Sequence, residues 1–238
     1  MKIVTTLIIT FLFLATSLLG EDKQSLAVYT YDSFNTEWGP GPQIEKAFEE
    51  SCNCDLKFVS AGDGAALLAK IRLEGRKTKA DVVLGLDSNV LQEARETKLF
   101  SPNSLNADLD LPIKWEDDTF LPFDWGFFAF VFDKNKTQNI PKSFEDLINS
   151  DIRLVIQDPR SSTPGLGLLL WIQKVFGKDS KSMWEKLSDN IVTVTPGWSE
   201  AYGMFLDGQT DFVLSYSTSP AYHMIVEEKN NYKSLIFD

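Results

Sequence analysis

Short apolar runs alternate with amphipathic runs along the first half of the chain, in the order strand, helix, strand, helix, strand. The strands are predicted at 25–31, 55–60 and 81–86, and the helices at 42–50 and 65–74. The helical period places Ile44, Ala47 and Phe48 on the inward face of the first helix. Because consecutive strands are joined through helices, we expect a parallel sheet covered by helices.

A second block with the same alternation follows a loop around residues 112–122. Its strands are predicted at 126–133, 153–158, 191–195 and 211–216, and its helices at 143–150, 164–176, 180–187 and 199–206. Two α/β blocks of about one hundred residues each fit two lobes around a ligand cleft. We therefore predict a first α/β lobe over 21–122 and a second α/β lobe over 123–216.

The N-terminus has the pattern of a secretory signal peptide. Lys2 supplies a positive charge, an apolar run follows from Ile3 to Leu19, and Gly20 precedes a polar run. The alternative is a membrane anchor, for which the run is slightly short, since a span needs about 20 apolar residues. We predict that residues 1–20 are removed on export.

Composition narrows the classes of function. The chain has 238 residues, of which 43% are hydrophobic and 24% charged, and its formal net charge is -11. These values predict a packed globular protein that does not bind nucleic acid or an anionic membrane surface. The charge is compatible with a cationic ligand but is also typical of a merely soluble protein.

Reactive residues are scarce. His223 is the single histidine, and the two cysteines, Cys52 and Cys54, are separated by one residue. One histidine and two cysteines are too few for a standard structural zinc site. Nucleophilic catalysis usually needs a histidine as the base, and the chain has only His223. We predict no enzyme activity, no cofactor and no metal, and leave open whether the cysteines pair.

Aromatic residues follow several predicted strands, where open α/β sheets bind their ligands. They are Tyr31, Trp38, Trp198, Tyr216 and Tyr222. Flat rings can hold a flat heterocycle and attract a cation over their faces. The alternative for each ring is core packing.

Polar residues occupy comparable positions. Asp63 lies between two glycines, where it either faces a ligand's cation or amino group or closes a turn. Thr163 and Pro164 suit the first turn of a helix, whose free N–H groups and neighbouring hydroxyls favour a phosphate or an alcohol. The alternative is an ordinary capped helix.

At these residues the chain resembles the family of bacterial periplasmic thiamine-binding proteins that serve ABC importers. The resemblance runs from about Leu26 to Asp238 and is carried by VYTYDSF (28–34), WGPGP (38–42), CNCDLK (52–57), KADVVLGLD (79–87), QDPRSSTPGLGLLLW (157–171), GWSEAYG (197–203) and LSYSTSPAYH (214–223). It implies a two-lobed periplasmic binding protein fold with two hinge crossings and a ligand cleft between the lobes. It also implies that family members continue past Asp238, so that residues 217–238 form a hinge and begin a return to the first lobe.

The resemblance implies a set of ligand-binding residues. The positions that match thiamine contacts are Asp63, Gly64, Ser162, Thr163, Trp198, Tyr216, Ser217, Thr218 and Ser219, and the nearby cleft aromatics are Tyr31, Trp38 and Tyr222. The implied function is periplasmic capture of thiamine or thiamine phosphates by a monomer that delivers them to an inner-membrane ABC transporter permease. The alternatives are a ferric-ion or polyamine binder on the same scaffold, and a thiamine-degrading enzyme.

Overall fold

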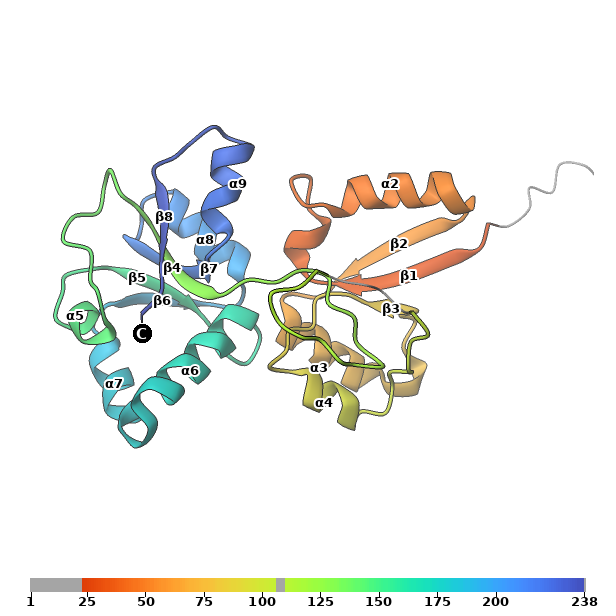
Figure 1. The fold of residues 1–238 in the computed structure, drawn as a ribbon, viewed down its shortest axis with the longest axis horizontal. Coiled ribbons are helices and arrows are strands. Elements are labelled where there is room, and N and C mark those ends of the chain that lie inside the picture. The colour runs from red at the N-terminus through yellow and green to blue at the C-terminus, as the bar shows by residue number, and fades with distance from the viewer. Residues whose placement is uncertain (1–22, 106–109, 238) are drawn as a thin grey trace, which may run out of the picture.

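The computed structural model describes residues 23–105 and 110–237, and Figure 1 shows two α/β lobes side by side. The predicted signal peptide lies outside the described residues. None of the described helices is both long and apolar enough to cross a membrane.

The first lobe is built on a parallel sheet with the strand order β2-β1-β3, as the sequence predicts. Its strands are β1 (Ser25–Thr30), β2 (Asp55–Ser60) and β3 (Val82–Val83). Its helices are α2 (Gly41–Cys52), α3 (Gly64–Glu74) and α4 (Leu91–Glu96), with short 3-10 turns at Asp32–Asn35 and Gly75–Lys77. In Figure 1, α2 lies on one side of the sheet and α3 and α4 on the other. Tyr29, Leu67 and Ile71 form the buried core between β1 and α3.

Two local predictions for this lobe are wrong. Ile44, Ala47 and Phe48 were expected to face inward, but all three are exposed, Phe48 to 40%. A helical period identifies side chains that share a face, but it does not establish that another element covers that face. The strand predicted at 81–86 is only Val82–Val83, at the edge of the sheet, where Val82 is exposed.

The second lobe is built on a mixed sheet with the strand order β6-β5-β7-β4-β8. Its strands are β4 (Phe128–Asp133), β5 (Leu154–Gln157), β6 (Ile191–Thr195), β7 (Phe212–Tyr216) and β8 (Tyr232–Leu235). Strand β5 runs parallel to β6 and β7, whereas β4 runs antiparallel to β7 and β8. Its helices are α5 (Phe144–Ile148), α6 (Thr163–Phe176), α7 (Ser180–Leu187), α8 (Trp198–Leu206) and α9 (Ser219–Ile225), with a 3-10 turn at Gly177–Asp179.

Both faces of this sheet are buried. Phe130 and Phe212 join a cluster with residues of α5, α6 and α7, while Val131 and Val213 join a cluster with residues of α8. Successive side chains of a strand point to opposite faces, so covering both faces requires the near-continuous apolar runs seen in β4 and β7. This packing fixes the strand ends that carry the candidate site.

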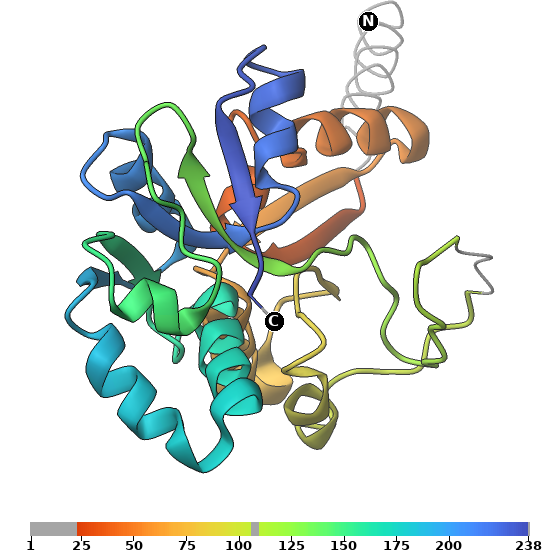
Figure 2. The ribbon, with the colours of Figure 1, turned by 60° about the vertical axis from the view of Figure 1, so that its left-hand side comes forward.

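The C-terminal segment is packed on the second lobe. Residues 217–238, which were expected to form a hinge that begins a return to the first lobe, contain α9 and β8, neither of which was predicted. Strand β8 pairs with β4, as Figure 2 shows (dark blue beside green), and Phe237 is buried against Phe130. Cross-strand pairing depends on partners distant in the sequence, so the local pattern could not place this strand.

The described chain crosses from the first lobe to the second just before β4. Phe123 packs against Phe34 of the first lobe at a ring-centroid distance of 5.7 Å. Four residues later, the Phe127 carbonyl accepts a hydrogen bond from the Ser217 backbone N–H of the second lobe (2.8 Å). Residues between these two points therefore connect the lobes. The second crossing stays a prediction.

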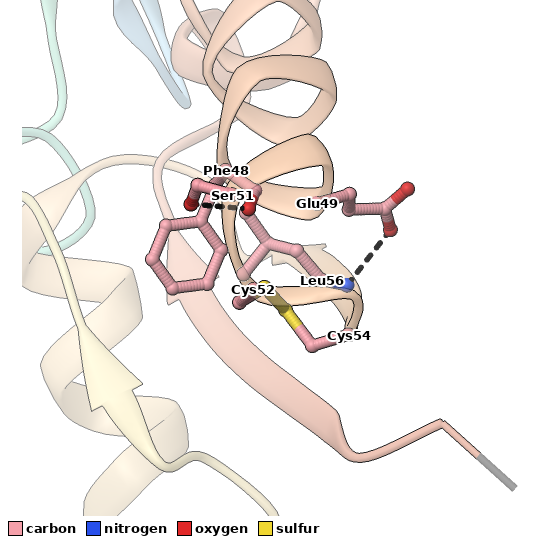
Figure 3. The surroundings of a disulfide bond; sticks show 6 residues. All are labelled: Phe48, Glu49, Ser51, Cys52, Cys54 and Leu56. Atoms are coloured by element: carbon pink, nitrogen blue, oxygen red, sulfur yellow. Dashed lines mark hydrogen bonds between the residues drawn. A yellow bond between two sulfur atoms is a disulfide. The ribbon is translucent and has the colours of Figure 1, made fainter. Parts of the chain in front are cut away.

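Cys52 and Cys54 form a disulfide at the C-terminus of α2, which answers the question that the sequence left open (Figure 3). Asn53 between them adopts a left-handed conformation (φ 50°) and its N–H bonds to the Glu49 carbonyl. The Glu49 side chain also accepts a hydrogen bond from the Leu56 N–H at the start of β2 (2.9 Å). The disulfide thus lies at the amino ends of the strands, opposite the candidate site.

Candidate functional site

Asp63 is the polar centre of the boundary between the lobes. It lies at the N-cap of α3 in the first lobe and is 9% exposed. Its Oδ2 accepts hydrogen bonds from two groups of the second lobe, the Ser162 hydroxyl (2.5 Å) and the Trp198 backbone N–H (3.0 Å). Three of the predicted site residues are therefore in direct contact.

Local sequence explains why donors point at this carboxylate. Ser162 is the N-cap of α6, and Trp198 is the first residue of α8. A helix start leaves backbone N–H groups unpaired and carries partial positive charge, which favours a carboxylate beside it. With α3, the starts of three helices converge on Asp63.

The pKa of the Asp63 carboxyl is nevertheless raised above its ordinary value of 3.8. Burial is the main cause, and the nearby charges of Asp32 and Glu200 act in the same direction. The bonds from Ser162 and Trp198 oppose this shift without cancelling it. Binding a cation would therefore relieve the cost of keeping this carboxylate ionised.

Gly64 and Thr163 face each other across a close approach of the two lobes. A Cβ added to Gly64 would meet the Thr163 Oγ1 at 2.6 Å and the Gly85 carbonyl at 2.8 Å. The Ala66 N–H also donates to the Ser161 carbonyl across the boundary (3.1 Å). Only glycine at position 64 permits this contact without movement of the backbone or of the opposite lobe.

The predicted aromatics Trp38, Trp198 and Tyr222 form one group that spans both lobes. Trp38 comes from the first lobe, and its ring centroid lies 6.1 Å from that of Trp198 and 6.4 Å from that of Tyr222. Trp38 is 51% exposed and Tyr222 is 38% exposed, so both residues are accessible from solvent. Trp198 also stacks on Tyr202, the next turn of α8, at 4.7 Å.

The hydroxyls after β7 have mainly structural partners. Ser219 bonds to Ser215 (2.7 Å) and accepts from the Tyr216 N–H (3.3 Å), and Ser215 in turn accepts from the Trp198 indole N–H (2.8 Å). Ser217 accepts from the Phe127 N–H through its hydroxyl (3.3 Å). These contacts hold the Trp198 ring and the lobe crossing in place.

Thr218 lies at the N-cap of α9 and is exposed. A Cβ added to Gly126 would come within 3.7 Å of its Oγ1, so Thr218 lies beside the lobe crossing. Its hydroxyl is available on this side of the site.

Tyr31 and Tyr216 lie near several carboxylates, of which Asp87 and Asp124 were not predicted as site residues. Burial raises the pKa of Tyr31 to about 12, with a contribution from Asp124. Burial also raises the pKa of Tyr216, with contributions from Asp63, Asp87 and Asp124. Asp124 lies in the lobe crossing and its own carboxyl pKa is raised by burial.

Only one of the two carboxylates that were not predicted had a sequence signal. Asp87 follows the third predicted strand and ends one of the segments that carry the family resemblance, whereas Asp124 stands between Phe123 and Trp125 in a stretch without a periodic pattern. Proximity to Tyr216 depends on the fold, so only the first could have been chosen from its position after a strand.

The arrangement combines aromatic faces, buried carboxylates and hydroxyls at helix starts. Such a set can hold a flat cation with an alcohol or phosphate at one end. Among residues 23–105 and 110–237 there is no group of three or more His, Cys, Asp or Glu placed to hold a metal ion.

A separate groove of about 570 Å³ lies beside α2. It is lined by Lys23, Pro42, Glu45, Lys46, Glu49, Glu50 and Asn53. None of the predicted site residues lines it, and it lies near the disulfide end of the first lobe. The strand-end residues therefore remain the candidate site.

A protein-family model and several curated relatives match most of this chain. The model of the bacterial extracellular solute-binding protein family matches residues 40–234. A thiamine-binding periplasmic protein of Escherichia coli K12 is 57% identical over 218 residues, which cover 90% of this chain and 67% of the relative. The thiamine-binding periplasmic protein of Haemophilus influenzae is 49% identical over 236 residues, which cover 98% of this chain and 71% of the relative. The chain thus spans about two thirds of the length of these relatives.

Solved structures of periplasmic binding proteins are also similar to this chain. A periplasmic thiamin binding protein superposes with a TM-score of 0.88 at 55% identity, covering 92% of this chain and 70% of that one. A fructose-6-phosphate-bound periplasmic binding protein from Actinobacillus pleuropneumoniae has a TM-score of 0.74 at 20% identity, and covers 90% of this chain and 70% of that one. This second similarity shows the shared two-lobed fold alone.

Proposed function

This chain belongs to the family of bacterial extracellular solute-binding proteins, and we propose that it captures thiamine in the periplasm for delivery to an ABC transporter. The proposal rests on relatives that are named thiamine-binding periplasmic proteins and are 49–57% identical over about nine tenths of the chain or more. Export through the predicted N-terminal signal peptide accounts for the location.

The observation that carries the proposal is the buried carboxylate of Asp63 beside the aromatic group of Trp38, Trp198 and Tyr222. Thiamine has a cationic thiazolium, a flat aminopyrimidine and an alcohol. Aromatic faces suit the two rings, and a carboxylate suits the positive charge or the amino group. Both hydrogen bonds to Asp63 end on Oδ2, which leaves Oδ1 for the ligand.

The twelve predicted residues divide into two roles in this proposal. Asp63, Thr163, Tyr31, Trp38, Trp198, Tyr216, Thr218 and Tyr222 contact the ligand, while Gly64, Ser162, Ser217 and Ser219 hold the lobes and rings around it. The Thr163 hydroxyl at the start of α6 extends the proposal to thiamine phosphates, since a helix start favours a phosphate.

The protein acts as a monomer that is not an enzyme and that presents its loaded lobes to an inner-membrane permease. The disulfide of Cys52 and Cys54 supports the absence of thiamine degradation, because it removes both thiols as nucleophiles and lies at the opposite end of the sheet. Incubation with thiamine and a nucleophile, followed by mass spectrometry, tests this; turnover would contradict it.

A calorimetric screen tests the ligand. Thiamine, thiamine monophosphate, thiamine diphosphate, spermidine and ferric citrate are titrated into the same preparation. We expect saturable binding of thiamine and its phosphates, with neither spermidine nor iron competing. Tighter binding of iron or spermidine than of thiamine would instead favour the other ligands found on this scaffold.

A further inference from the structure

His223, the single histidine of the chain, is buried in α9 behind the candidate site. It is 2% exposed. Its Nε2 lies 2.9 Å from the Tyr202 hydroxyl, and its Nδ1 lies 2.8 Å from the Glu227 Oε2. Each ring nitrogen therefore has one specific partner, contributed by a different part of the second lobe.

Tyr202 connects this histidine to the site. Its ring stacks on Trp198 (4.7 Å, 25°), and its hydroxyl reaches the His223 ring, which lies nearly parallel to the Tyr202 ring (5.8 Å, 10°). Trp198 and Tyr202 are four residues apart on α8, the spacing at which helical side chains meet. Contacts among these three rings thus connect the site with the interior of the lobe.

The Tyr202–His223 hydrogen bond also ties α8 to α9. Helix α9 carries Tyr222, whose ring contacts Trp38 of the first lobe, and α8 carries Trp198. The bond therefore fixes the relative position of two aromatic residues on which ligand binding is proposed to depend.

Charged and titratable groups around His223 define the proton positions. Burial raises the pKa of the Tyr202 hydroxyl, so this hydroxyl stays protonated and donates to Nε2. The hydrogen bond from His223 and the contact with Lys229 (3.0 Å) lower the pKa of Glu227, so this carboxylate accepts from Nδ1–H. The ring of Tyr232 in β8 packs against the histidine at 4.2 Å, and Tyr222 touches it edge-on at 5.6 Å.

We propose that Tyr202, His223 and Glu227 form a positioning chain that holds Trp198 and Tyr222 for the ligand and makes affinity depend on the protonation of His223. The proposal rests on the proposed function for its ligand. In the neutral ring Nε2 accepts from Tyr202. Protonation turns Nε2 into a donor, so the Tyr202 oxygen can only accept from it, and the buried hydroxyl proton loses its acceptor. The hydrogen bond between α8 and α9 then runs in the opposite direction, and the unpaired buried donor weakens the packing that holds Trp198.

The test measures the dissociation constant of thiamine from pH 5 to pH 8 in the wild type and two variants. We expect the wild-type affinity to fall by about fivefold or more at the acid end, the lower range of a typical coupling between sites. His223→Gln offers an acceptor at the place of Nε2 but cannot be protonated, so it keeps near-wild-type affinity at pH 8 and loses the additional acid fall. Tyr202→Phe keeps the stacking but removes the donor, so its affinity falls about two- to tenfold at pH 8, as for loss of one neutral hydrogen bond.

Tyr232→Phe is the matched control, because it removes a phenol hydroxyl beside His223 without touching the Tyr202–His223 bond. It should reproduce the wild-type pH profile. Asp63 and the ligand ionise in the same way in the wild type and in all three variants. The difference between the pH profiles of wild-type and His223→Gln affinity therefore reports the protonation of His223 alone. The proposal would be overturned if the thiamine affinity of His223→Gln falls at acid pH as much as that of the wild type. It would also be overturned if the loss of affinity in Tyr202→Phe is fully explained by a lower melting temperature.

A ligand-free measurement separates this proposal from the proposed function. Because the chain has one histidine, its imidazole gives one set of nitrogen resonances by NMR. We expect an unprotonated Nε2 and a protonated Nδ1 at pH 8, a changed Nε2 resonance in Tyr202→Phe, and an unchanged one in Tyr232→Phe. The opposite tautomer would overturn the positioning chain even if thiamine binds, whereas failure of the wild type to bind thiamine would overturn the proposed function.

Discussion

Replacing Asp63 by Asn should separate binding from stability. Asn keeps nearly the same shape, and its amide oxygen can accept from the Ser162 hydroxyl and the Trp198 N–H in place of Oδ2. The substitution therefore removes a buried charge while retaining both contacts between the lobes. A contact to a charged group is worth about 1.5–3 kcal/mol, so thiamine affinity should fall roughly tenfold to a hundredfold.

The stability of the same variant should not fall. The pKa of Asp63 is raised above 3.8 in the folded state, so the fold favours the protonated carboxyl. The stability that this carboxyl contributes is therefore fully present at pH values below 3.8 and is lost as the pH rises through the folded-state pKa. At pH 7 the ionised carboxylate therefore costs stability, and Asn does not carry this cost. The melting temperature of Asp63→Asn should equal or exceed that of the wild type, with a gap that widens from pH 4 to pH 7.

The assay pairs calorimetric titration of thiamine with thermal unfolding at each pH. Asp63→Ala is one control, because it leaves the two donors without an acceptor, at about 1–3 kcal/mol each. Its melting temperature should fall by about 2–4 °C per kcal/mol for a chain of this size. Asp151→Asn, an exposed carboxylate, is the second control and should change neither property. Wild-type thiamine affinity in Asp63→Asn, or a melting temperature as low as that of Asp63→Ala, would refute the reasoning.

Three further predictions concern other parts of the chain. Trp198→Ala should weaken thiamine binding by about 2 kcal/mol, the value of a desolvated cation–aromatic contact, and should lower the free energy of unfolding by much less. If calorimetry shows the same thiamine affinity in the variant and the wild type, this ring is not part of the site. Gly64→Ala should weaken binding by holding the lobes apart, whereas Gly203→Ala, with open space around its Cβ position, should not; equal affinities measured by calorimetry would contradict this. Replacing Cys52 and Cys54 by Ser should cost about 1.6 kcal/mol in the chain-entropy model for so short a loop and leave thiamine affinity unchanged, which unfolding and binding measurements together check.

Much of the fold followed from the sequence because its signals are local. The strand at 55–60, the helix at 180–187 and the strand at 191–195 have the predicted bounds, and the parallel order of the first sheet follows from its strand–helix alternation. Apolar periodicity, Pro at helix starts and turn residues act over a few positions, so they can be recognised without a structure. Seven candidate site residues were also selected in this way, as aromatic and polar side chains near strand ends: Tyr31, Trp38, Asp63, Thr163, Trp198, Tyr216 and Tyr222. The other five candidates came from the family resemblance.

Other features depended on contacts between distant positions. Asp63 meets Ser162 and Trp198 across 99 and 135 residues, and nothing local predicts that its Oδ2 bonds to both. The same reason explains the placement of β8 beside β4 and the exposure of the apolar face of α2, which has a clear helical period but is not covered within the described residues.

The sequence by itself determined the family, the type of most elements and which residue types stand at the strand ends. The tertiary structure decided which of them lie together: a carboxylate in contact with both lobes, a hydroxyl that holds the Trp198 ring, and a buried histidine placed behind it. The physical reason is that side-chain chemistry belongs to single residues, whereas burial, pKa and hydrogen bonding arise only when the fold brings separated residues within a few ångströms.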